Sequence, residues 1–183
     1  MEKSSEAKKE LVTHIKANAL RTDGPFQLSS GGTSSWYLDG RQVTYSGTGG
    51  RLVAACIGEL LDPAVTAVGG LTMGADPVAI AAALLADPPL RAFSIRKEVK
   101  AHGAGGRIVG PVRPDDRVAV VDDTTTTGSS FAESIEVLHE AGISVVQALV
   151  VVDRSSGAAG KRCAELGVPF SAVIYPADLG IIE

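Results

Sequence analysis

The residue types best suited to chemistry lie in one continuous segment, RVAVVDDTTTTGSSF, at positions 117–131. Its apolar first part predicts a buried strand that leads into two acids, four threonines, a glycine and two serines. A helix is predicted to begin at Ser130. Backbone N–H groups and hydroxyls that converge at a helix N-terminus bind anions, and the helix dipole favours them. The segment therefore predicts a phosphate site beyond the end of a strand.

The paired acids Asp122 and Asp123 indicate what accompanies that phosphate. Carboxylates repel a phosphate unless ribose hydroxyls or a bound cation lie beside them. A phosphorylated sugar satisfies both requirements, with its phosphate on the hydroxyl-rich turn and its hydroxyls on the acids. The alternative is structural: the two acids cap a turn and the Ser/Thr run is a helix N-cap cluster.

A second feature is a basic, glycine-rich stretch. Seven basic and three acidic residues occur between Arg91 and Arg117, which leaves a charge of −8 on the rest of a chain whose total is −4. The centre of this stretch reads RKEVKAHGAGG from Arg96. We expect residues 97–114 to form a long mobile loop that clamps an anion, with glycines that let it open and close. A solvated surface loop is the alternative.

The remaining pattern predicts an α/β fold. Strand-like and helix-like stretches alternate, which is typical of a parallel sheet covered on both faces. Pro77 is expected at the first helical position, and Gly142 just beyond the end of a helix. Helices are predicted up to about Ala19 and at 51–61, 77–86, 130–141 and 157–166; strands are predicted at 65–68, 90–95, 117–121, 145–152 and 171–175, with a short strand pair from Phe26.

Composition narrows the class of protein. A chain of 183 residues with 45% hydrophobic and 21% charged residues is expected to form one globular domain. The acidic balance and 4% aromatic content argue against a nucleic-acid binder. Cys56 and Cys163 form no CxxC pair, which favours reduced thiols in a cytoplasmic protein. The N-terminus has no secretory signal, and the longest apolar run is too short for a membrane helix.

Four segments together resemble the type I phosphoribosyltransferases, and within them the orotate phosphoribosyltransferase family. VAVVDDTTTTGSS resembles the signature that binds phosphoribosyl pyrophosphate (PRPP), and RKEVKAHGAGG is similar to the family's flexible catalytic loop. FQLSSGGTSSWYLDGR and VVVDRSSG resemble its N-terminal substrate segment and its arginine-bearing strand end. The resemblance implies a central parallel sheet flanked by helices, with a small N-terminal hood (about residues 1–45), a PRPP-binding core (46–183) and a catalytic loop (97–114).

The resemblance also implies roles for individual residues. Asp122 and Asp123 match acids that hold the ribose hydroxyls, and residues 126–130 match the 5-phosphate cradle. Lys100 and His102, together with the two acids, are the implied catalytic residues. The full PRPP-binding set implied is Arg96, Lys97, Lys100, His102, Asp122, Asp123, Thr124, Thr125, Thr126, Thr127, Gly128, Ser129 and Ser130. The orotate-binding set implied is Tyr37, Leu38, Thr126 and Arg154.

Arg154 also has a physical argument of its own. It follows a predicted buried strand, and an arginine fork suits a planar carboxylate such as that of orotate. A structural turn pair with Asp153 is the alternative. The sequence departs from the family at Ser29 and Met73, where many members carry lysine; backbone N–H groups of residues 71–74 are expected to serve the pyrophosphate instead.

The activity implied is transfer of the phosphoribosyl group of PRPP to orotate, giving orotidine 5-monophosphate and pyrophosphate in UMP biosynthesis. We expect Mg²⁺ to be carried mainly by PRPP oxygens, with no metal site of the protein's own. A homodimer whose loop is shared across the interface is also implied. Purine phosphoribosyltransferases, PRPP-sensing transcriptional regulators and phosphoacceptor signalling domains are the alternatives; acceptor tests distinguish the first, and the charge outside the loop argues against the second.

Overall fold

The computed structural model describes residues 5–27, 33–98 and 106–181. Within these ranges the central sheet has six strands in the order β10-β9-β8-β5-β6-β7. Neighbouring strands are parallel except β7, which runs antiparallel to β6. The predicted α/β fold with a central parallel sheet is confirmed. The strands are β5 (Ala67–Leu71), β6 (Arg91–Ile95), β7 (Ile108–Val109), β8 (Arg117–Thr125), β9 (Ser144–Asp153) and β10 (Phe170–Ile174).

The chain leaves the middle of the sheet in two directions. From β5 it passes through α4 (Ala75–Leu85) to β6 on one side, whereas from β8 it passes through α5 (Ser129–Glu140) to β9 on the other. In such sheets ligands bind beyond the carboxyl ends of the strands where the strand order reverses. The boundary between β5 and β8 is therefore the expected place for a site.

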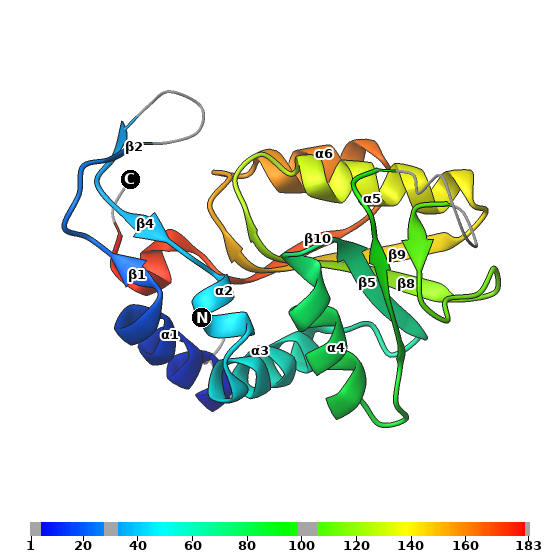
Figure 1. Cartoon of the computed structure of the whole chain (residues 1–183), viewed down its shortest axis with the longest axis horizontal. Helices are drawn as coiled ribbons and strands as arrows, with labels where there is room; N and C mark the ends of the chain where they lie inside the picture. Colours follow the sequence, from blue (N-terminus) through cyan, green and yellow to red (C-terminus); the bar gives the residue numbers. More distant parts are fainter. Residues whose placement is uncertain (1–4, 28–32, 99–105, 182–183) are drawn as a thin grey trace.

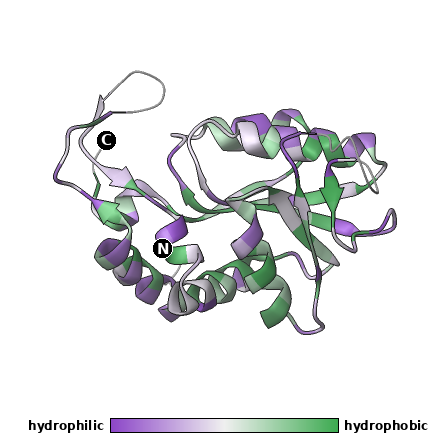
Figure 2. Ribbon diagram, viewed as in Figure 1, coloured by the Kyte–Doolittle hydropathy of each residue, from purple (hydrophilic) through white to green (hydrophobic). Residues whose placement is uncertain are grey.

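Helices cover both faces of the sheet (Figure 1). α1 (Glu6–Asn18), α3 (Gly47–Leu60) and α4 lie on one face, and α5 and α6 (Ala158–Glu165) lie on the other. Successive strand residues point to opposite faces, so Val121 packs in the α3 core while Val120 packs against α5. Figure 2 shows hydrophobic residues in the sheet and along α4, and many hydrophilic residues along α1. None of the described helices has the length and apolar content needed to cross a membrane.

The N-terminal hood consists of short strand pairs beside the sheet. β1 (Leu20–Arg21) pairs with β4 (Tyr37–Leu38), and β2 (Phe26–Gln27) pairs with β3 (Thr33–Ser34). α2 (Arg41–Thr44) then leads to α3. The 3₁₀ helix η1 (Pro176–Leu179) packs against α1. The buried side chains of Trp36 and Leu38 join the hood to the core that α1 and α3 form.

Several predicted boundaries were wrong. β8 does not stop before the acids but continues to Thr125, because β9 provides a partner as far as Asp153. The predicted loop over 97–114 contains β7, which pairs with β6. Pro77 is the third residue of α4 rather than the first, a position where its missing N–H costs nothing because first-turn N–H groups have no helical partner.

The predicted end of one helix was confirmed, whereas the predicted start of another was wrong. Gly142 lies just beyond α5 with φ +72°, and its N–H donates to the His139 carbonyl at 2.9 Å. α3 begins four residues before the predicted start because the Ser46 hydroxyl caps its N-terminus, accepting the Gly49 N–H at 2.9 Å.

Candidate active site

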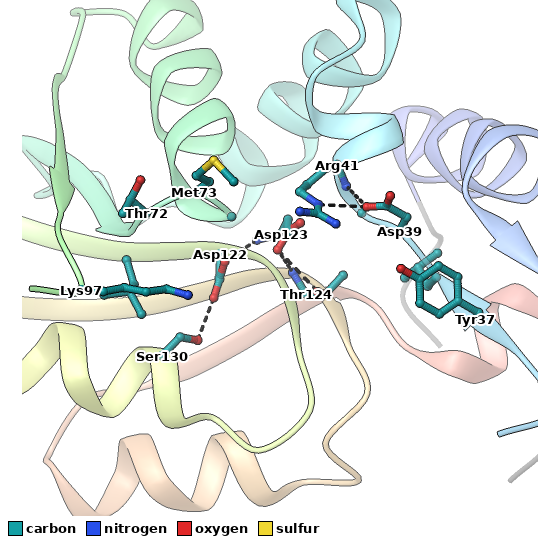
Figure 3. Close-up of a pocket in the computed structure, with 14 residues that line it drawn as sticks. Tyr37, Asp39, Arg41, Thr72, Met73, Lys97, Asp122, Asp123, Thr124 and Ser130 are labelled. Carbon is teal, nitrogen blue, oxygen red and sulfur yellow. Dashed lines mark hydrogen bonds and ion pairs between the residues drawn. The ribbon is translucent and has the colours of Figure 1, made fainter. Parts of the chain in front are cut away.

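A cleft of about 400 Å³ opens at the carboxyl ends of β5 and β8 (Figure 3). Four separate parts of the chain form its walls: the end of the hood, the turn after β5, the second residue after β6, and the end of β8 with the start of α5. This is the position that the reversal of strand order predicts. The lining residues are Tyr37, Leu38, Asp39, Gly40, Arg41, Leu71, Thr72, Met73, Gly74, Lys97, Asp122, Asp123, Thr124 and Ser130.

Two buried carboxyl groups form the floor of this cleft. Asp122 and Asp123 are only 7% and 9% exposed. The Ser130 hydroxyl donates to Asp122 Oδ2 at 2.7 Å, and the Thr124 N–H donates to Asp123 Oδ1 at 2.7 Å. Burial, and then the charge of Asp123, raise the pKa of Asp122 to about 7. Burial likewise raises the pKa of Asp123. The pair therefore retains a proton at a higher pH than ordinary aspartates do.

Glycine backbone lies directly against these carboxylates. A Cβ atom on Gly74 would lie 2.4 Å from Asp122 Oδ1 and 2.7 Å from Asp123 Oδ1. A Cβ atom on Gly40 would lie 2.9 Å from Asp123 Oδ2. The turn after β5 and the start of α2 can approach the acids this closely because both positions lack a side chain.

The hydroxyl-rich turn joins β8 to the N-terminus of α5. Gly128 is buried with φ +75°, and its N–H donates to Thr125 Oγ1 at 3.0 Å. Thr126, Thr127 and Ser129 are exposed, and the Thr127 hydroxyl donates to Ser129 Oγ at 3.0 Å. The turn thus presents hydroxyls beside the first N–H groups of α5, a combination suited to an anion.

Arg41 is a cleft residue that the sequence argument did not single out. Asp39 Oδ1 accepts from Arg41 Nε at 3.1 Å, and Gln42 Nε2 donates to Asp39 Oδ2 at 3.3 Å. Figure 3 shows Arg41 extending from the hood over the cleft near Asp123. Among the described lining residues, Arg41 and Lys97 carry positive charge. The cleft therefore has cations on two walls and acids on its floor.

No family model matches the chain. Among curated proteins, it is 43% identical over 183 residues to an orotate phosphoribosyltransferase of Corynebacterium glutamicum, covering 97% of this chain and 96% of the relative. The chain belongs to the orotate phosphoribosyltransferase family. An orotate phosphoribosyltransferase of Mycobacterium tuberculosis H37Rv, solved with Fe(III) dicitrate, superposes with a TM-score of 0.86 at 34% identity, covering 96% and 99% of the two chains. The same enzyme in complex with PRPP superposes with a TM-score of 0.81 at 33% identity and the same coverage.

The structure brings together part of the PRPP set that the orotate phosphoribosyltransferase family implies. Residues 122–124, Ser130 and Lys97 line the cleft, and residues 125–129 continue from it around the turn. Arg96 is half-buried, and its backbone pairs with Arg107 rather than lining the cleft. Lys100 and His102 lie outside the described residues, as does Ser29.

The four positions that match the family's orotate contacts are divided between two places. Tyr37 and Leu38 both line the cleft, where Tyr37 is 38% exposed and the Leu38 side chain is largely buried in the core beside α1. Thr126 and Arg154 are not among the cleft-lining residues. Arg154 is joined to the hydroxyl turn, because its N–H donates to the Thr125 carbonyl at 2.8 Å.

The turn after β5 only partly meets the expectation for residues 71–74. The Thr72 N–H donates to the Ile95 carbonyl at 2.8 Å, so that group is not available to a pyrophosphate. Met73 is 58% exposed at the rim of the cleft and brings no charge. The residues that sequence reasoning missed are Asp39, Gly40 and Arg41 in the cleft and Trp36 in the core beneath the hood. Their position in the segment WYLDGR, next to Tyr37 and Leu38, was the available signal.

Proposed function

We propose that this protein transfers the phosphoribosyl group of PRPP to orotate, giving orotidine 5-monophosphate and pyrophosphate in the synthesis of UMP. The observation that carries this is the buried pair Asp122 and Asp123 beside the hydroxyl turn of α5. This arrangement suits a phosphorylated ribose, and membership in the orotate phosphoribosyltransferase family supports orotate as the acceptor.

The cleft has a place for each part of PRPP. The 5-phosphate lies on the turn of residues 126–130, where hydroxyls and helix N–H groups meet. The ribose hydroxyls donate to Asp122 and Asp123, which must then be ionised. Because burial favours the protonated form of the empty pair, PRPP binding releases a proton. The pyrophosphate lies toward Gly74, between Arg41 and Lys97.

In the reaction, the bond from ribose C1 to pyrophosphate breaks and its electron pair leaves with the pyrophosphate. Nitrogen N1 of orotate, having lost its proton to solvent, forms the new bond to C1. Negative charge therefore grows on the leaving group, and Arg41 and Lys97 are placed to stabilise it. The two aspartates face the ribose, where positive charge develops. No covalent protein nucleophile is required.

The donor set of the cleft fits Mg²⁺ that arrives on PRPP. Mg²⁺ is usually held by one or two carboxylates together with phosphate oxygens and water, and the acids on the floor offer such carboxylates. When bound, Mg²⁺ would neutralise charge on the pyrophosphate. Asp122 and Asp123 are the residues that would approach it.

Acceptor recognition is assigned to Arg154, Thr126 and Tyr37. The orotate carboxylate accepts two hydrogen bonds from N–H groups of the Arg154 guanidinium. Thr126 contacts the ring, and the Tyr37 ring flanks it from the hood side. Leu38 supports Tyr37 from the core, because its own side chain is buried.

We also propose a homodimer in which Lys100 and His102 of one subunit serve the cleft of the other. Mixing Lys100→Ala with Asp123→Asn tests this, because hybrid dimers contain one cleft with neither substitution. Recovery of up to about a quarter of wild-type activity is expected, and no recovery after subunit exchange contradicts a shared loop. A cytoplasmic location agrees with the free, buried thiols of Cys56 and Cys163.

The direct test follows orotate absorbance with purified protein, PRPP and Mg²⁺. Turnover that requires PRPP is expected, and omission of Mg²⁺ tests whether turnover also requires the metal. Adenine and hypoxanthine serve as alternative acceptors, and preferential turnover of either would overturn the proposal. If PRPP raises the Tm but orotate is not consumed, the PRPP site stands and orotate is the wrong acceptor.

A further inference from the structure

The only tryptophan in the chain lies against Arg154. The guanidinium carbon of Arg154 is 4.0 Å from the centroid of the Trp36 ring. Trp36 is 5% exposed and packs in the same core as residues of α1 and α3. It lies between β3 and β4 of the hood, whereas Arg154 follows β9 of the central sheet. This contact therefore connects two parts of the chain that are 118 positions apart.

The Trp36 ring lies under the guanidinium carbon of Arg154. An aromatic ring contacts the face of a guanidinium group, while the five N–H donors lie in the guanidinium plane and point outward. The same residue is held at its backbone, where the Arg154 N–H donates to the Thr125 carbonyl at 2.8 Å. One attachment thus joins Arg154 to the hydroxyl turn, and the other joins it to the hood.

We propose that Trp36 is a positioning residue that orients the Arg154 fork toward the carboxylate of the acceptor base. The inference rests on the proposed function, because it assumes an acceptor that carries a carboxylate. A flexible arginine loses rotamer freedom when it binds, and a rigid aromatic platform removes part of that cost beforehand. Trp36 thereby makes recognition of the base depend on how the hood sits on the core.

The first test compares orotidine 5-monophosphate with uridine 5-monophosphate as competitive inhibitors against PRPP, because the two differ only in the base carboxylate. Wild-type protein is expected to bind the orotidine nucleotide more tightly. Trp36→Leu should reduce this preference roughly 3- to 30-fold, the range that cation–π contacts cover from exposed to desolvated sites. Trp36→Phe, which keeps an aromatic face, should retain most of it.

The matched control is Phe131→Leu. Phe131 is a fully buried aromatic residue in the other core, where it contacts the Phe170 ring edge-on. Its loss should lower stability while leaving the nucleotide preference unchanged. If Trp36→Leu also leaves the preference unchanged, or if Phe131→Leu lowers it equally, Trp36 is a packing residue and the inference is wrong.

A second measurement requires no change at Trp36. Because the chain has a single tryptophan, its emission maximum reports directly on the surroundings of Arg154. Orotidine 5-monophosphate should shift the emission in wild-type protein far more than uridine 5-monophosphate does, and Arg154→Ala should abolish the difference. Equal shifts with both nucleotides would overturn the inference. Absence of orotate turnover by wild-type protein would instead contradict the proposed function itself.

Discussion

Replacing Asp122 with asparagine should stabilise the unliganded protein at neutral pH while abolishing turnover. Asp122 is 7% exposed and lies next to a second carboxyl group, so its ionised form is disfavoured in the folded chain. A neutral amide removes that penalty but cannot accept two ribose hydroxyls as a carboxylate does. Stability and activity are therefore expected to change in opposite directions.

The sign of the pH dependence follows from the raised pKa. The folded chain binds this proton more tightly than the unfolded chain, so the free energy of unfolding falls as pH rises from about 4 to about 7. One proton contributes at most about 1.4 kcal/mol for each pH unit. Between pH 5 and 7, Asp122→Asn should therefore gain roughly 2–3 kcal/mol relative to wild type, or roughly 4–10 °C in Tm.

The assay is urea and thermal unfolding of both proteins at pH 5, 6, 7 and 8 without ligand. A stability difference that stays constant across this range, or an Asn variant less stable than wild type at pH 8, would refute a protonated pair. Turnover with orotate and PRPP is measured on the same preparations. Retained activity would remove Asp122 from the proposed ribose site.

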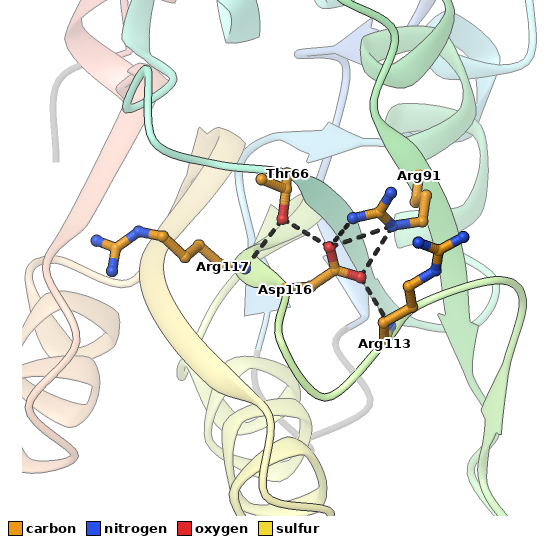
Figure 4. A network of polar contacts seen from close by, with 5 residues as sticks. All are labelled: Thr66, Arg91, Arg113, Asp116 and Arg117. Carbon is orange, nitrogen blue, oxygen red and sulfur yellow. Dashed lines mark hydrogen bonds and ion pairs between the residues drawn. The ribbon is translucent and has the colours of Figure 1, made fainter.

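Asp116 provides a control of opposite sign at the amino ends of β5, β6 and β8, the end of the strands opposite to the cleft (Figure 4). It is 1% exposed, pairs with Arg91, and accepts the Thr66 hydroxyl and the Arg113 N–H, both at 2.7 Å. The hydrogen bond from Arg91 is the main cause that lowers the pKa of Asp116 to about 2. Asp116→Asn should therefore destabilise the protein by roughly 2–3 kcal/mol at pH 7, and this difference should shrink as pH falls from about 4 toward 2.

Three further substitutions test the cleft and its supports. Gly74→Ala places a Cβ atom against both carboxylates and should lower kcat/KM for PRPP at least 100-fold in steady-state assays; near-normal kinetics would contradict the close approach. Arg41→Ala should raise KM for PRPP about 10-fold, whereas Arg51→Ala, which removes an exposed arginine on α3, should not. Equal effects of the two substitutions would mean that net charge of the protein, rather than a contact from Arg41, governs PRPP binding. Gly128→Ala combines a positive φ with a 2.7 Å approach to the Ala159 backbone and should cost about 2–4 kcal/mol in urea unfolding; an unchanged midpoint would refute the strain.

The fold could be predicted from local pattern to a large extent. Buried strands such as β9 read as continuous apolar runs, and helix ends carried local signals such as Gly142. Boundaries that depend on a partner strand were missed. β8 continues past Asp122 and Asp123 because β9 lies alongside, and β7 forms because β6 is there to pair with it. Neither partner is visible in the local residue pattern.

The candidate site divides in the same way. Asp122, Asp123 and the hydroxyl turn are consecutive in the chain, so their chemistry was readable as a motif. Arg41 and Trp36 were not singled out because their importance depends on distant residues. Arg41 lies near Asp123, which is 82 positions away, and Trp36 contacts Arg154, which is 118 positions away. An arginine in the hood segment cannot be assigned to the site from the sequence, because only the fold brings it close to the two acids.

The sequence by itself thus indicated the kind of ligand, because a strand, two acids and a hydroxyl-rich helix start follow one another in the chain and together suit a phosphorylated ribose. It also carried the motifs by which the family was identified. Only the tertiary structure decided the protonation of the two acids and which residues surround them. Burial under Gly40 and Gly74 raises the affinity of Asp122 and Asp123 for a proton, and the reversal of strand order between β5 and β8 brings four separate parts of the chain to one cleft. Desolvation and long-range approach are properties of the packed chain, so no local pattern could reveal them.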